Sequence, residues 1–198
     1  MASAREGILA SPHVIGELVT WKGLFNSAQL DALERLGDGL ALEQAGLSGQ
    51  GVNAIRKTQV AWVERTQETE AVYRRMEDVV LQLNGSFFRF DLSGLMTLQY
   101  AVYGGPDGGY FDWHKDYGRD REGRAWEPRK VTLSLQLSDG ADYDGCDLEV
   151  RAGNQIDTAP RVRGTLVAFP ANVLHRVTPI TRGIRKSLVI WAVGPEFR

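Results

Sequence analysis

The stretch VTLSLQL, residues 131–137, alternates apolar and polar side chains along its whole length. Strict alternation is typical of a β-strand with one face on a core, because successive side chains point to opposite faces. One face carries the apolar residues Val131, Leu133, Leu135 and Leu137, and the other carries Thr132, Ser134 and Gln136. In a closed core of two sheets, we expect the polar face to line a cavity.

Short alternating segments separated by glycine-rich turns continue from about residue 95 to about residue 195, which predicts an antiparallel β core. Two helices are expected before it, in a supporting region of about residues 24–85. The first begins at the N-cap Asn26, ends near residues 37–39 and presents Leu30, Leu33 and Leu36 at helical spacing. The second stops at residues 84–85, and its apolar face is formed by Val72, Met76, Val79, Val80 and Leu83. Both helices should pack on the outside of a sheet, and residues 1–198 are interpreted as one domain, mainly β with flanking helices.

A candidate metal site lies in the predicted β core. His114 and Asp116 are separated by one residue, so a strand would place both on one face while Lys115 points away. His175 lies in the β-branched, apolar segment 173–177, which is typical of a second strand folded alongside. Two imidazoles and one carboxylate are the protein ligands of non-haem Fe(II) oxygenases, and they leave coordination positions open for a co-substrate and dioxygen.

A basic residue follows the second histidine. Arg185 and Ser187 share a strand face with Val189 and Trp191, while Lys186 should face the other way. A guanidinium recognises a carboxylate with two parallel hydrogen bonds and keeps its charge. The order of metal ligands and then arginine therefore suggests 2-oxoglutarate, with Arg185 as the anchor of its distal carboxylate and Ser187 as a helper.

The alternative for these residues is a purely structural histidine pair. The chain has three histidines, and two of them occupy the ligand positions. His13 belongs to the N-terminal segment and is interpreted as an exposed or capping residue. The strand context and the arginine spacing favour the metal site over the structural pair.

From residue 97 to the C-terminus the chain resembles the prolyl-hydroxylase-like Fe(II) and 2-oxoglutarate dioxygenases, particularly their bacterial and phage branch. The matching segments are residues 98–105, Gly109 and Tyr110, His114 and Asp116, residues 164–170, residues 175–177, Pro179 and residues 183–188. The upstream segment 55–62 looks like the strand that often precedes this core.

The resemblance implies a distorted double-stranded β-helix, or jelly roll, with His114, Asp116 and His175 on iron and Arg185 on the distal carboxylate of 2-oxoglutarate. It also implies a tyrosine in the pocket. Tyr103 is favoured for this role over Tyr100, because Tyr103 shares a strand face with Gln99 and Ala101. Gln99 is accordingly a candidate substrate contact.

Three positions depart from the family pattern. Gly145 and Cys146 stand where many relatives have two glycines before the strand that covers the site. Gln136 stands where protein-modifying prolyl hydroxylases often have a tyrosine near the co-substrate, so it is a candidate co-substrate contact, and the substrate can differ from peptidyl proline. Arg185 replaces the lysine of collagen-type members and keeps the carboxylate-binding role.

The segment from Tyr117 to Lys130 is rich in charge and contains Trp126. One interpretation is a lid in which Trp126 and arginines such as Arg124 select a substrate with an acidic group. The other is a solvated connection, because charged loops are commonly just surface.

Composition limits the function classes. A formal net charge of −2 with mixed signs argues against a general nucleic-acid-binding or membrane-binding surface. The N-terminal residues do not form a secretory signal, no stretch is long enough to span a bilayer, and Cys146 is the single cysteine. We therefore expect a cytoplasmic protein without internal disulfides, in which Cys146 is a packing residue.

The sequence thus predicts an oxygenase that uses Fe(II), 2-oxoglutarate and dioxygen, with ascorbate as an optional stimulant, to hydroxylate an unactivated C–H bond and release succinate and carbon dioxide. The substrate is expected to be a peptidyl residue such as proline, or a free amino acid or other small metabolite. Two alternatives stay open: a metal-binding β-helix module without turnover, and a nucleic-acid demethylase. Oligomeric state is left open.

Overall fold

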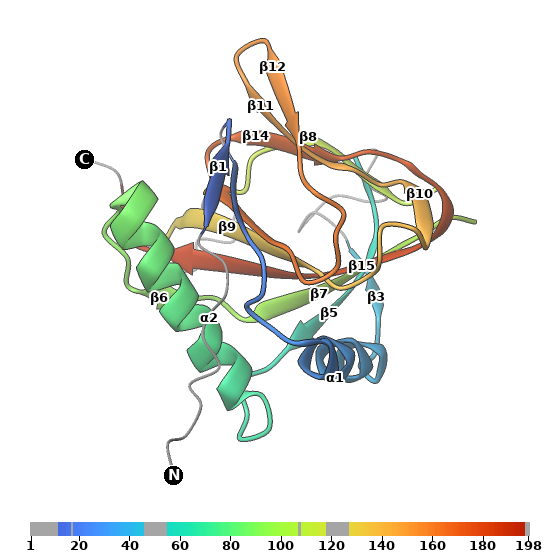
Figure 1. The fold of residues 1–198 in the computed structure, drawn as a ribbon, viewed down its shortest axis with the longest axis horizontal. Helices are drawn as coiled ribbons and strands as arrows, with labels where there is room; N and C mark the ends of the chain where they lie inside the picture. Colours follow the sequence, from blue (N-terminus) through green and yellow to red (C-terminus); the bar gives the residue numbers. More distant parts are fainter. Residues whose placement is uncertain (1–11, 17, 46–54, 107, 118–126, 197–198) are drawn as a thin grey trace.

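Two antiparallel sheets pack face to face in the computed structural model, which describes residues 12–16, 18–45, 55–106, 108–117 and 127–196 (Figure 1). The major sheet has the strand order β1-β2-β13-β9-β15-β7-β5-β3, and β10 and β6 also pair with β15. Its strands are β1 (His13–Ile15), β2 (Leu18–Trp21), β3 (Glu43–Gln44), β5 (Gln59–Val63), β6 (Gly94–Leu95), β7 (Leu98–Gly104), β9 (Arg129–Gln136), β10 (Tyr143–Gly145), β13 (Leu166–Pro170) and β15 (Ile180–Val193).

The minor sheet has the order β12-β11-β14-β8-β4. Its strands are β4 (Arg56–Lys57), β8 (Tyr110–His114), β11 (Leu148–Ala152), β12 (Gln155–Thr158) and β14 (Leu174–Val177). Two sheets with flanking helices confirm the predicted class, mainly β with a distorted jelly-roll core. Within the described residues, no helix combines the length and the apolarity needed to cross a membrane.

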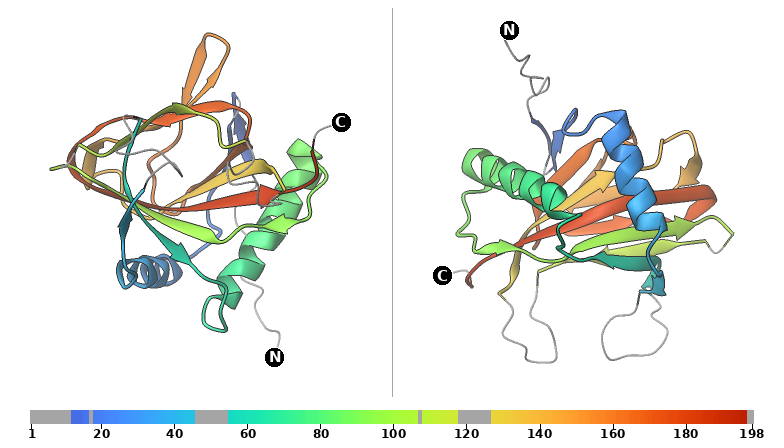
Figure 2. Two further views of the ribbon diagram at one scale, coloured as in Figure 1. Left: turned by 180° about the vertical axis from the view of Figure 1, so that it is seen from behind. Right: turned by 90° about the horizontal axis from the view of Figure 1, so that it is seen from below.

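The helices α1 (Ser27–Asp38) and α2 (Glu70–Leu83) lie on the outer face of the major sheet, away from the minor sheet (Figures 1 and 2). The predicted N-cap is confirmed, because the Asn26 side chain accepts from Gln29 N at 2.9 Å and the Gln29 side chain accepts from Asn26 N. Leu30 and Leu33 of α1 and Met76 of α2 belong to one buried cluster with the outward apolar residues of the sheet. Burial of this shared apolar area holds the helices on the sheet.

The second α-helix stops at the predicted position, with Asn84 as its C-cap, but the chain continues into a further helical turn. The α-helix ends at Leu83, but the backbone continues as a π-helical turn, η1 (Asn84–Phe88), and leaves it at Arg89 in the left-handed conformation. Asn84 closes this turn, since its side chain both donates to Phe90 O and accepts from Phe90 N. A side chain that satisfies the backbone beyond the helix allows the extra turn.

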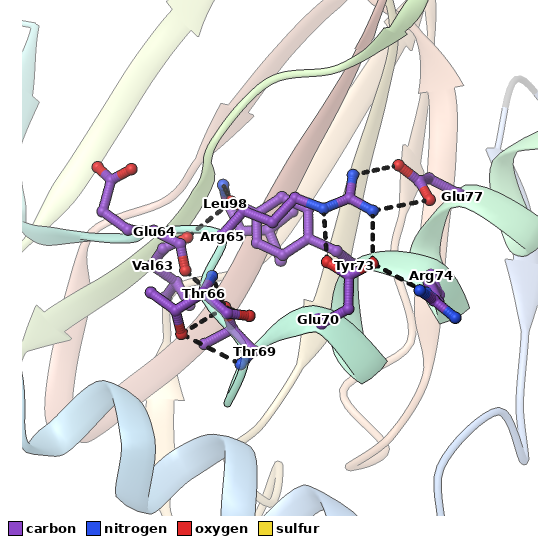
Figure 3. Close-up of polar contacts among 10 residues, drawn as sticks. All are labelled: Val63, Glu64, Arg65, Thr66, Thr69, Glu70, Tyr73, Arg74, Glu77 and Leu98. Carbon is purple, nitrogen blue, oxygen red and sulfur yellow. Dashed lines mark hydrogen bonds and ion pairs between the residues drawn. The ribbon is translucent and has the colours of Figure 1, made fainter.

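Polar contacts join α2 to two strands (Figure 3). The Tyr73 hydroxyl donates to Val63 O at 2.7 Å and accepts from Leu98 N at 3.1 Å, so one buried group bridges β5 and β7. Arg65 forms ion pairs with Glu70 and Glu77 on the exposed side of the helix. These contacts explain Tyr73 as a structural residue.

Residues 55–62 do not form the single strand that the resemblance suggests. They divide at Thr58 into β4, which pairs with β8 in the minor sheet, and β5, which pairs with β7 in the major sheet. The Thr58 hydroxyl donates to Tyr110 O at 3.4 Å at this corner. The change of sheet brings Arg56 and Trp62 to different walls of the same cavity.

Candidate active site

The space between the sheets contains a cavity of about 470 Å³. That volume lies within the range of small-molecule sites, roughly 300–1,000 Å³. The predicted polar face of β9 contributes Thr132 and Ser134 to its wall, as expected. Gln136, the third polar residue of that face, lies beyond this wall and lines a small second cavity.

The structure brings His114, Asp116 and His175 together. β8 and β14 are antiparallel neighbours, and His114 is directly opposite His175 in their register, with ring centroids 4.1 Å apart. Asp116 lies two residues beyond His114, just past the end of β8 rather than on the strand. One ligand atom from each of the three residues lies within 4.8 Å of the other two.

Backbone carbonyls fix which imidazole nitrogens face Asp116. His114 Nδ1 lies 2.7 Å from Asp112 O, and His175 Nδ1 lies 3.0 Å from Val173 O. A carbonyl only accepts hydrogen bonds, so each Nδ1 carries the proton and each Nε2 keeps its lone pair. The Nε2 atoms lie 3.7 Å and 3.4 Å from the Asp116 carboxylate oxygens. This is the arrangement in which metal-binding histidines are usually held.

The charge states of His114 and Asp116 suit a cation. Burial lowers the pKa of His114 to about 4, so its imidazole is neutral at physiological pH. Burial alone would raise the pKa of Asp116, but His175 and His114 hold it well below its usual range, so the carboxylate stays ionised. A carboxylate with two imidazoles and no thiolate matches the donor set of non-haem Fe(II).

Two further side chains orient Asp116. Its Oδ2 accepts hydrogen bonds from the Thr132 hydroxyl at 2.7 Å and from the Trp191 indole at 2.9 Å. Arg129 Nη1 lies 3.9 Å from Oδ1, and the guanidinium lies over the Trp191 ring at 4.0 Å. Sequence reasoning placed Thr132 and Trp191 on inward faces but missed both contacts, because they depend on strands that are distant in sequence.

Arg185 is buried in the major sheet, with 4 % of its surface exposed. Its Nε donates to Gln136 Oε1 at 3.1 Å, and its guanidinium lies 5.7 Å from the centroid of the Tyr103 ring. Among the described residues it has no carboxylate partner. A buried guanidinium with only neutral neighbours is costly unless an anion reaches it.

Of the other predicted co-substrate contacts, Ser187 and Tyr103 lie in the wall of the main cavity and Gln136 does not. Ser187 and Tyr103 line this wall together with Arg185. Burial raises the pKa of Tyr103, so its hydroxyl remains a hydrogen-bond donor. Gln136 contacts Arg185 rather than the main cavity, and its amide nitrogen donates to the Tyr143 hydroxyl at 3.0 Å. Gln136 therefore holds the Arg185 guanidinium from outside the main cavity.

Tyr100 points away from the cavity. It packs in the cluster under the helices, and its hydroxyl donates to Asp38 Oδ1 at 2.7 Å. Lys186 also faces outward, as expected, and pairs with Glu34 and Asp38 of α1. Lys115, expected to point away, is exposed but also contributes to the cavity wall.

Gln99 lines the cavity, while Trp126 and Arg124 lie outside the described residues, as does most of the proposed lid. Cys146 is buried, as predicted for a packing residue. Sequence reasoning gave Arg56 and Trp62 no role in the site and placed Arg129 only in the charged segment 117–130, but all three line the cavity. Trp62 is 42 % exposed and its ring centroid lies 6.3 Å from that of Trp191.

Comparisons with known proteins agree with this geometry. A family model described as the 2OG-Fe(II) oxygenase superfamily matches residues 98–193. A PKHD-type hydroxylase of Paraburkholderia phytofirmans is 28 % identical over 85 % of this chain and 74 % of the relative. A PKHD-type hydroxylase of Paraburkholderia xenovorans is 38 % identical over 31 % of this chain, and the matching stretch spans only 27 % of that relative.

Solved structures show the same fold. A prolyl-4-hydroxylase of Pseudomonas putida superposes with a TM-score of 0.71 at 24 % identity, over 91 % of this chain and 94 % of that one. A prolyl hydroxylase of Trichoplax adhaerens, in complex with a hypoxia inducible factor peptide fragment, superposes with a TM-score of 0.70 at 18 % identity, over 89 % of this chain and 83 % of that one.

Proposed function

Because a model of the 2OG-Fe(II) oxygenase superfamily matches residues 98–193, we propose that this chain is a hydroxylase that uses Fe(II), 2-oxoglutarate and dioxygen. It inserts one oxygen atom of dioxygen into an unactivated C–H bond of its substrate and the other into succinate, with release of carbon dioxide. The observation that carries this proposal is the convergence of His114, Asp116 and His175, with both Nε2 atoms facing the carboxylate.

In this proposal the three converging side chains hold Fe(II), and Fe(II) bound there supplies the oxygen activation that no side chain can perform. Thr132 and Trp191 fix the orientation of the Asp116 carboxylate through their hydrogen bonds. No side-chain general base is needed for the reaction.

Arg185 binds the distal carboxylate of 2-oxoglutarate in this account, with Ser187 and the protonated hydroxyl of Tyr103 as further donors. Arg185 is suited to this role because, among the described residues, it contacts neutral side chains such as Gln136 and Tyr103 and pairs with no carboxylate. Gln136 supports the guanidinium instead of contacting the co-substrate. Ascorbate is proposed as a stimulant that keeps the iron reduced.

We propose as substrate either a peptidyl residue such as proline or a free amino acid or similar metabolite. The relatives named as prolyl hydroxylases, one of them holding a peptide, favour the first class by similarity. The presence of Gln136 in place of the tyrosine typical of protein-modifying prolyl hydroxylases favours a free amino acid or similar metabolite.

The test is release of succinate from 2-oxoglutarate, measured with and without Fe(II), across free amino acids and peptides. We expect Fe(II)-dependent succinate that rises with the right substrate and falls to background in Asp116→Ala. Asp144→Ala removes an exposed carboxylate that pairs with Arg182 and serves as the matched control. Iron binding without any succinate would identify a module without turnover, and an oxidised nucleic acid as product would identify a demethylase.

A further inference from the structure

Arg56 occupies the cavity wall opposite the proposed co-substrate anchor. It lies in β4 at the edge of the minor sheet, whereas Arg185 lies in β15 of the major sheet. The Arg56 guanidinium is 4.5 Å from the centroid of the Phe111 ring, and that ring stacks on His114 with centroids 3.4 Å apart. Arg56 is therefore separated from a proposed iron ligand by a single aromatic ring.

The described residues leave the charge of Arg56 without an anionic partner. Nη2 donates to Gln99 Oε1 at 3.1 Å, and this neutral amide is its hydrogen-bond partner within the described part of the chain. The Nε atom is buried and has no hydrogen-bond partner. A buried donor without a partner destabilises the folded chain unless a ligand or water accepts from it.

The balance of charge in the cavity also favours an anion. Its described lining holds the basic residues Arg56, Lys115, Arg129 and Arg185 and the acidic residues Glu43 and Asp116. Fe(II) and 2-oxoglutarate carry opposite charges of equal size, so their binding leaves the positive excess in place. Arg129 already has Asp116 within 4 Å, which leaves the partly buried Arg56 as the guanidinium available to a further ligand.

Building on the proposed function, we propose that Arg56 binds a carboxylate of the primary substrate, with Gln99 holding its guanidinium in place. We take this group to be the main-chain carboxylate of a free amino acid, which a residue inside a peptide lacks. Phe111 forms the apolar floor beneath this site.

The experiment compares each of the twenty free L-amino acids with its carboxamide, on protein loaded with Fe(II) and 2-oxoglutarate under nitrogen. Binding is followed by the fluorescence of Trp62 and Trp191, which line the cavity. We expect at least one acid to bind roughly tenfold or more tightly than its amide, since a charge-assisted hydrogen bond is lost. No binding of any free acid, or equal binding of acid and amide, overturns the proposal.

Variants then assign the preference to Arg56. In Arg56→Gln the ratio between acid and amide should fall close to one, and Arg56→Lys should restore part of it. Arg74→Gln removes a charge from the exposed side of α2 and should keep the ratio. A preference that survives in Arg56→Gln, or a change that affects 2-oxoglutarate instead of the acid, overturns the assignment. The ratio is first measured on the unaltered protein, so the test does not depend on how the variants fold.

A separate readout distinguishes this proposal from the function on which it rests. Fe(II)-dependent succinate formation without added substrate tests the oxygenase chemistry alone. If that reaction occurs and acids show no preference over amides, the Arg56 proposal is wrong and the proposed function stands. If no succinate forms under any condition, the proposed function itself fails.

Discussion

Arginines on the outer surface and arginines in the cavity differ in their partners. Outside, Arg161 pairs with Asp147 at 2.7 Å and Arg163 pairs with Glu34 at 2.9 Å. In the cavity, Arg56 and Arg185 each donate to a glutamine oxygen at 3.1 Å and have no carboxylate among the described residues. The difference matters because burial makes an uncompensated charge costly, so the cavity is where ligand charges are needed.

The largest expected effect comes from removing a cavity arginine. Arg185→Leu should weaken 2-oxoglutarate binding by about 3 kcal/mol or more, roughly 100-fold, because one partner of a buried ion pair is lost. Isothermal titration of the Fe(II)-loaded protein with 2-oxoglutarate under nitrogen measures this, and Fe(II) binding should be largely kept. Unchanged affinity for the co-substrate would move the anchor to another residue.

A cavity arginine can also be made to resemble a surface arginine. Gln136→Glu keeps the side-chain size but places a carboxylate beside Arg185 Nε. The new charge should compete with the co-substrate and weaken its binding roughly tenfold or more, since a hydrogen bond from Arg185 to a neutral amide becomes an ion pair. Gln136→Leu provides the comparison without a charge. Tighter 2-oxoglutarate binding in Gln136→Glu would contradict the role assigned to Arg185.

Loss of one hydrogen bond that orients Asp116 is expected to have a smaller effect, on the affinity for Fe(II). Thr132→Val keeps the shape of the side chain and removes the hydroxyl that donates to Asp116 at 2.7 Å. Replacing such outer contacts typically costs about 10–100-fold in metal affinity. The lower end is expected here because Trp191 still donates to the same oxygen. Competition with a coloured Fe(II) chelator measures the change, and equal affinity would show that Trp191 alone is sufficient.

The smallest effect is expected at the surface. Arg163→Gln removes ion pairs with Asp31 and Glu34 of α1 and should cost roughly 1 kcal/mol of unfolding free energy, because ion pairs that stay in contact with solvent contribute little. Urea unfolding measures this cost, while the affinities for Fe(II) and 2-oxoglutarate should equal those of the unaltered protein. A large loss of co-substrate affinity in this variant would remove the contrast between surface and cavity.

Local sequence patterns were sufficient for much of the fold and for the inward faces of the long strands. Alternation along β7 separated Tyr103 from Tyr100, and alternation along β15 separated Arg185 from Lys186. These strands are long enough for a period of two to be read from the sequence. The N-cap at Asn26 was predicted because capping is a local interaction.

The remaining features depend on contacts between distant segments. Arg56 lies in a strand of two residues that has no periodicity of its own, and it enters the cavity because the chain changes sheets at Thr58. The hydrogen bonds of Thr132 and Trp191 to Asp116 depend on the register of β9 and β15 against the end of β8. Neither feature leaves a local signal in the sequence.

The most direct test of the account is a stepwise titration of the protein under nitrogen, first with Fe(II) and then with 2-oxoglutarate. We predict that one Fe(II) binds per chain and that adding 2-oxoglutarate produces the visible absorption of an iron-chelated keto acid, with both signals lost in Asp116→Ala. Absence of saturable Fe(II) binding, or an absorption band that is unchanged in Asp116→Ala, would contradict the assignment of His114, Asp116 and His175 as the metal centre.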